Sequence, residues 1–90
     1  MNQTKLLIGS LSNDLYRAAC MIQRGSLTGA KRFVDESQRW TRDLQHKEIK
    51  PYIRDIVADL KDNHQQLDMA QAEKYLMYSV LLQNYALHLD

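Results

Sequence analysis

The sequence is poor in the residues that interrupt or cross-link a chain. It has one proline, three glycines and one cysteine among 90 residues. A many-stranded fold needs more turn residues than this, and the strand-favouring residues Val and Thr are also sparse. A single cysteine excludes an internal disulfide, so packing or association must supply the stability. The sequence therefore predicts an all-α protein that forms one domain over residues 1–90.

The sequence also lacks a strong excess of one sign of charge and any long apolar run. Twelve Lys and Arg residues against eleven Asp and Glu residues give a formal net charge of +1. This balance argues against a general nucleic-acid coat protein. The longest apolar stretch, residues 75–82, contains Ser79 and is far shorter than the roughly 20 residues that cross a bilayer. The N-terminal residues lack the apolar run of a secretory signal, and one cysteine fits a reducing compartment. We therefore expect a cytoplasmic protein without a membrane span.

Apolar residues recur at spacings of three and four along most of the chain. This period matches one face of an α-helix. The sequence predicts four helices joined by short turns, and such turns make consecutive helices antiparallel neighbours in an up-down four-helix bundle. The predicted helices cover residues 4–24, 29–45, 51–62 and 69–88.

Turn and cap residues mark the ends of these helices. Gly25 can adopt the left-handed conformation that commonly follows a helix, and Thr28 can cap the second helix. Pro51 suits the first position of the third helix, and Asp68 can cap the fourth. An alternative joins the second and third helices into one rod kinked at Pro51. The charged, unpatterned segment 45–50 favours a break instead.

The fourth predicted helix is apolar almost all round. On a helical wheel its core stripe consists of Met69, Ala72, Leu76, Val80 and Leu87. A second arc carries Tyr75, Tyr78, Leu82, Tyr85 and Leu89. The polar seam between the two is narrow and consists of Glu73, Asn84 and His88.

A four-helix bundle this small has no middle position that would bury both arcs of one helix. We therefore predict that the second arc contacts a second copy of the protein or another protein. Tyrosine suits such a surface, because its ring buries a large area while its hydroxyl tolerates water. The alternative is that the wide arc packs against two neighbouring helices of the same chain.

The first predicted helix shows a weaker signal of the same kind. The side opposite its core stripe carries few charges and consists of Leu6, Gly9, Asn13, Tyr16 and Cys20. It is a candidate for a second contact surface. The alternative is an exposed face without a partner, on which the cysteine is incidental.

The residues that commonly carry chemistry are not arranged for it. No two of the three histidines stand four residues apart, the spacing that places two metal ligands on one helix face. Cys20 has no neighbour in the sequence that could take its proton. We predict no enzymatic activity, no metal site and no cofactor.

The charge is divided unevenly along the chain. Residues 1–50 hold nine Lys and Arg against five Asp and Glu, a net of +4, and residues 51–90 hold three against six, a net of −3. Arg32, Arg39 and Arg42, near Trp40, are therefore candidates for contacts with nucleic-acid phosphates. Acidic residues four positions away neutralise much of this charge.

Together these patterns predict a non-catalytic interaction or regulatory module. Its predicted partner is a second copy of the chain, in a homodimer, or another protein. Nucleic-acid binding through the basic side of the first two helices is the alternative hypothesis.

Overall fold

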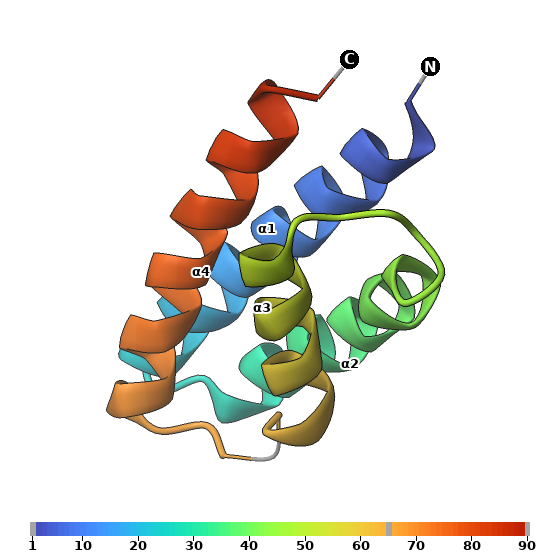
Figure 1. Ribbon diagram of the computed structural model, residues 1–90. Helices are drawn as coiled ribbons and strands as arrows, with labels where there is room; N and C mark the ends of the chain where they lie inside the picture. Colours follow the sequence, from blue (N-terminus) through green and yellow to red (C-terminus); the bar gives the residue numbers. More distant parts are fainter. Residues whose placement is uncertain (1, 65, 90) are drawn as a thin grey trace.

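Four α-helices account for the regular structure in the computed structural model, which describes residues 2–64 and 66–89 (Figure 1). No strand occurs among the described residues. The helices are α1 (Gln3–Gln23), α2 (Leu27–Leu44), α3 (Pro51–Asp62) and α4 (Met69–Leu87). The predicted all-α antiparallel four-helix bundle is confirmed. The predicted bounds agree within two residues, and α2 and α3 are separate helices. Residues 1, 65 and 90, which the predicted domain includes, lie outside the described residues.

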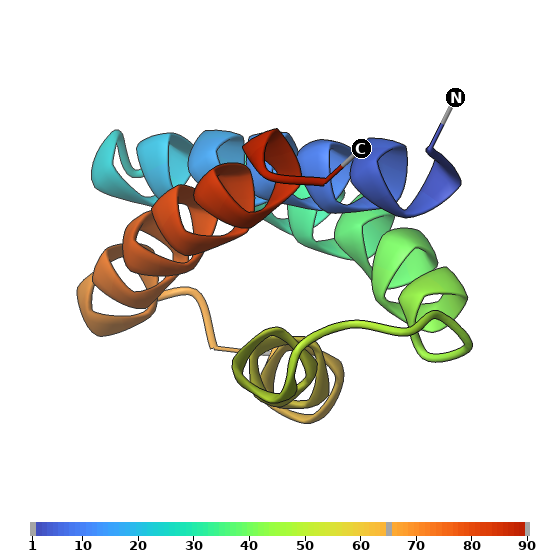
Figure 2. The same ribbon diagram turned by 45° about the horizontal axis from the view of Figure 1, so that its top comes forward.

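α1 packs along both α4 and α2. α3 lies on the opposite side of the bundle from α1, across the space between α2 and α4 (Figure 2). Because α1 has a neighbour on each side, it buries a wide face. Its buried apolar residues are Leu7, Ile8, Leu11, Leu15, Ala18, Ala19 and Ile22.

The turn from α1 to α2 follows from the conformation of Gly25. Its φ of 79° is left-handed, as the sequence predicted, and the Ser26 amide donates to the Met21 carbonyl oxygen at 2.8 Å. These features close the helix in a Schellman turn. The predicted cap at Thr28 is wrong. The turn reverses the chain so tightly that Ser26 takes the cap position, and Thr28 already lies in the first turn of α2.

The starts of α3 and α4 agree with the prediction from the sequence. Pro51 is the first residue of α3, where its missing amide proton leaves no bond unmade. Asp68 caps α4, because its Oδ1 accepts a hydrogen bond from the Gln71 amide at 2.9 Å. None of the described helices combines the length and the apolar character that a membrane span requires.

Candidate functional site

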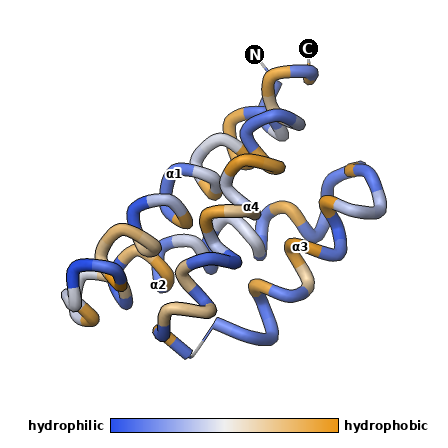
Figure 3. Tube along the Cα trace, turned by 90° about the vertical axis from the view of Figure 1, so that its left-hand side faces the viewer, coloured by the Kyte–Doolittle hydropathy of each residue, from blue (hydrophilic) through white to orange (hydrophobic). Residues whose placement is uncertain are grey.

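The outward side of α4 carries large apolar side chains that the bundle leaves in solvent. Orange and tan recur along α4 in Figure 3, which colours the chain by hydropathy. The side chains concerned, exposed by between 37% and 65%, are Met69, Met77, Val80, Leu81 and Leu87. We call these five residues the outer face of α4. A helix that is apolar on both sides has more hydrophobic surface than one small bundle can cover.

The predicted roles of the two arcs of α4 are wrong in large part. The arc predicted to meet a partner lies inside the chain. Tyr75 and Leu82 are fully buried, and Tyr78, Tyr85 and Leu89 are partly buried. In the predicted core stripe, Ala72 is buried and Leu76 is partly buried, but the other three members are exposed. These are Met69, Val80 and Leu87.

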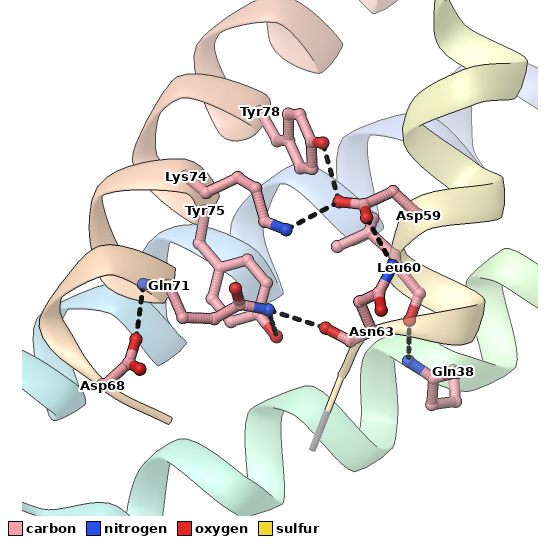
Figure 4. Close-up of polar contacts among 9 residues, drawn as sticks. All are labelled: Gln38, Asp59, Leu60, Asn63, Asp68, Gln71, Lys74, Tyr75 and Tyr78. Atoms are coloured by element: carbon pink, nitrogen blue, oxygen red, sulfur yellow. Dashed lines mark hydrogen bonds and ion pairs between the residues drawn. The ribbon is translucent and has the colours of Figure 1, made fainter. Parts of the chain in front are cut away.

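Polar groups of α3 and of the segment after it satisfy the hydroxyls of the inward-facing tyrosines (Figure 4). The Asp59 carboxylate accepts hydrogen bonds from the Tyr78 hydroxyl at 2.7 Å and from the side-chain amide of Asn63 at 2.8 Å. The Lys74 ammonium lies 3.0 Å from the same carboxylate. A half-buried tyrosine therefore keeps its hydroxyl bonded while its ring packs, which removes the cost of burying an unpaired polar group.

Gln71 satisfies the second buried tyrosine. Its side-chain nitrogen donates to the Tyr75 hydroxyl at 3.1 Å and to the Asn63 carbonyl oxygen at 2.7 Å. On the other side of α3, the Gln38 amide of α2 donates to the Leu60 carbonyl oxygen at 3.2 Å. These hydrogen bonds form a cluster that connects α4 and α2 to α3, while α4 packs mainly along α1.

The hydrogen bonds of this cluster also shift its acid–base equilibria. Burial alone would raise the pKa of Asp59, but hydrogen bonds from Tyr78, Lys74 and Asn63 outweigh it and lower the pKa below 3.8. Burial and the bond to Asp59 raise the pKa of Tyr78 to about 12. The carboxylate and the neutral phenol are thus the stable forms at neutral pH. Because the folded chain lowers the pKa of Asp59, its stabilisation is present at neutral pH and is lost as the pH falls below 3.8.

Tyr78→Phe tests this contact with the smallest possible change. Loss of the hydroxyl leaves Asp59 with one donor fewer, so we expect the free energy of unfolding to fall by about 1 kcal/mol. The pKa of Asp59, followed by NMR, should rise toward 3.8. The matched control is Tyr16→Phe on the exposed side of α1, which should change neither quantity. An unchanged Asp59 titration in Tyr78→Phe would contradict the contact.

The predicted second contact surface lies on the outer side of α1. Leu6, Asn13 and Tyr16 are exposed, and Gly9 and Cys20 are partly exposed. An open hollow of about 400 Å³ lies at the start of this face. Its lining residues are Asn2, Lys5, Leu6, Gly9, Ser10 and Asn13. The face is accessible, and its role as an interface stays a prediction.

The three arginines proposed for nucleic-acid binding are exposed on α2. Arg39 lies over the Trp40 ring at 5.3 Å, and Arg32 lines a hollow that also contains Glu36. Lys31 nearby is paired with Asp35 at 2.7 Å. Arg42 lies in the last turn of the helix. Acidic groups therefore interleave with the cations, and nucleic-acid binding stays a prediction that no contact of the described residues favours.

A buried carboxyl group between α1 and α2 was missed by the sequence analysis. Asp14 is buried, and its Oδ2 accepts a hydrogen bond from the Trp40 indole nitrogen at 2.8 Å. Burial raises the pKa of Asp14 to about 6, and the carboxyl of Glu36 adds to the rise against the opposing effects of Trp40 and Arg17. The helical spacing could have revealed this burial, because Asp14 stands three residues after Leu11, on the apolar stripe of α1.

Metal-binding and nucleophilic groups are scattered over the fold. In the part of the chain that the structure describes, no three His, Cys, Asp or Glu side chains converge on one point. Cys20 is a partly exposed free thiol, and His88 at the end of α4 bonds through Nδ1 to the Asn84 carbonyl oxygen at 2.7 Å.

Comparison with known proteins identifies no relative. No family model matches the chain, and no curated protein or solved structure shows a significant match to it. The exposed surfaces described above are therefore the features that point to a function.

Proposed function

We propose that the protein is a non-catalytic protein–protein interaction module that forms a homodimer through the outer face of α4. The observation that carries this proposal is the exposure of five large apolar side chains on one helix whose opposite side already completes the core. Single exposed apolar residues are ordinary on protein surfaces, but a row of them along one helix is typical of a surface that is covered in the working state.

The core does not need this face. Tyr75 and Leu82 fill the interior from α4, and the hydroxyl of Tyr75 is hydrogen-bonded. Residues on the outer face are therefore available for association without unfolding any part of the bundle. Methionine adds to this suitability, because its flexible side chain adapts to the shape of a partner.

The double substitution Val80→Lys with Leu81→Lys tests the proposal. Both side chains lie on the outer face, so two charges there should oppose association while the helices stay formed. We expect the dimer dissociation constant, measured by sedimentation equilibrium, to rise at least about tenfold, with an unchanged helical circular dichroism spectrum.

A matched control places a charge on another helix. Ala58→Lys changes an exposed residue of α3 and should leave the dissociation constant unaltered. The proposal is wrong if the unmodified protein stays monomeric at about 100 μM, a concentration well above the dissociation constants of most specific dimers. It is also wrong if Val80→Lys with Leu81→Lys leaves a dimer intact.

A further inference from the structure

Six of the exposed residues of α4 and its C-cap form one stripe whose spacing reads the same in both directions, and the exposed Met69 and Leu87 lie beside this stripe. The stripe consists of Glu73, Met77, Val80, Leu81, Asn84 and His88. The steps between successive members are four, three, one, three and four residues. These are the spacings that keep residues on one side of an α-helix. The midpoint of the stripe lies between Val80 and Leu81.

A two-fold axis through this midpoint, perpendicular to the helix, brings the stripe onto itself. It sets Glu73 against the partner's His88, Met77 against the partner's Asn84, and Val80 against the partner's Leu81. We propose that the occupant of the outer face of α4 is a second copy of the chain, whose α4 packs antiparallel to the first with Val80 and Leu81 at the two-fold axis. This inference rests on the proposed function, and it adds the orientation and the register of the dimer.

The ionisable groups at the two ends of the stripe favour the antiparallel orientation. Glu73 and His88 stand fifteen residues apart, about 22 Å along the helix. A parallel pair would set carboxylate against carboxylate at one end and imidazole against imidazole at the other. The antiparallel pair converts both ends into a carboxylate facing an imidazole, and a closed two-fold dimer repeats that contact twice.

The distribution of polarity along the stripe fits such an interface. Met77, Val80, Leu81 and the polar Asn84 lie in the middle, and the ionisable residues lie at the ends, where solvent reaches them. Interfaces have the same order, with a dry apolar centre inside a polar rim.

The length of the contact sets the expected affinity. A single pair of helices in contact over about 22 Å buries less surface than the roughly 1,200 Å² at which specific stable interfaces begin. We therefore expect a dimer dissociation constant on the order of micromolar rather than nanomolar.

Cysteine cross-linking tests the orientation directly. In a Cys20→Ser background, single cysteines at exposed positions of α4 are treated with a short bis-maleimide at a protein concentration that gives dimer. Val80→Cys lies beside the proposed axis and should cross-link to itself. Glu73→Cys should not cross-link to itself, but a mixture of Glu73→Cys and His88→Cys should give the mixed product. Self-linkage of Glu73→Cys would show a parallel dimer and overturn the inference.

Charge reversal tests the register. In an antiparallel dimer His88→Glu sets two carboxylates against each other, and Glu73→Lys removes the carboxylate that faces the imidazole, so each should raise the dissociation constant about three- to tenfold. The double variant restores opposite charges and should return to within about threefold of the unmodified protein. Each single change also places an unfavourable charge for the helix dipole, so the double variant should have the least stable helix. Recovery of the dissociation constant in the double variant would therefore come from the pair and not from helix stability.

The outcomes separate this inference from the proposed function. If Val80→Lys with Leu81→Lys abolishes the dimer but the charge-reversed pair shows no recovery, the face is correct and the register is wrong. If the unmodified protein is a monomer, the proposed function and the antiparallel register are both wrong. Asp55→Lys on exposed α3 is the control for nonspecific charge effects and should leave dimerisation unchanged.

Discussion

Leu82→Ala is expected to lower the free energy of unfolding by about 2 to 5 kcal/mol, the usual cost of removing a buried leucine side chain. Leu82 is 0% exposed and belongs to the core cluster with Tyr75 and residues of the other helices. Such a loss is a large fraction of the roughly 5 to 15 kcal/mol that stabilises a typical domain. Urea denaturation followed by circular dichroism measures it through the midpoint and slope of the transition.

Leu87→Ala is the matched control, because it makes the same chemical change on the same helix. Leu87 is 65% exposed, so its loss should change the free energy of unfolding by less than about 0.5 kcal/mol. Both variants should be measured at low protein concentration, where association contributes nothing. Equal costs at the two positions, or a greater cost at Leu87, would show that α4 is rotated from the orientation described.

Asp14→Asn is expected to stabilise the protein at pH 7 by about 1 to 2 kcal/mol. Asp14 is 5% exposed, and burial is the main reason that its pKa rises from 3.8 to about 6. At pH 7 Asp14 is ionised, and its buried carboxylate makes the folded state less stable than the neutral acid would. Asparagine keeps the shape and still accepts the Trp40 hydrogen bond, but it carries no charge to bury.

The pH dependence has a definite sign. Because the pKa of Asp14 is higher in the folded chain than in the unfolded one, the folded chain binds the proton more tightly. The unfolding free energy contributed by this group is highest below pH 3.8, falls as the pH rises from 3.8 to about 6, and is constant above that. The advantage of Asp14→Asn should accordingly shrink as the pH is lowered from 7 toward 4.

The control for this experiment is Asp43→Asn on the exposed surface of α2, which should have no comparable effect at either pH. Chemical denaturation at pH 4 and pH 7 gives the change in unfolding free energy that each of the two variants causes at each pH. Destabilisation by Asp14→Asn at pH 7 would mean that the Asp14 carboxylate is favourable in the fold, through Arg17 or Trp40, and would contradict the prediction.

Local signals in the sequence were sufficient for the helices and for most of their ends. Gly25, Pro51 and Asp68 act through their own backbone or their nearest neighbours, so their effects can be predicted without knowing the rest of the fold. The cap predicted at Thr28 was wrong because the turn that ends α1 and the first turn of α2 lie within a few residues of each other. Only the geometry of the turn that ends α1 shows that Ser26 lies at the cap.

The candidate site was predicted only in its general character. The excess of apolar surface on α4 is a property of composition, and the structure retains it. The identity of the exposed residues is a property of rotation, and there Val80 and Leu87 exchange places with Tyr75 and Leu82. Asp14 was also passed over, because its depth depends on Trp40, which stands 26 residues away in the chain.

The sequence by itself determined that this chain makes four helices, where most of them begin and end, and that the last of them carries more apolar surface than it can bury. Tertiary structure alone decided which side of α4 faces inward. A helix that is apolar all round has a period but no preferred face, so its rotation depends on partners elsewhere. The main partner is α1, along which α4 packs, and Tyr75 and Leu82 fill the core between the helices. Asp59 and Asn63 of the α3 region add hydrogen bonds with the Tyr78 hydroxyl and the Gln71 side-chain amide.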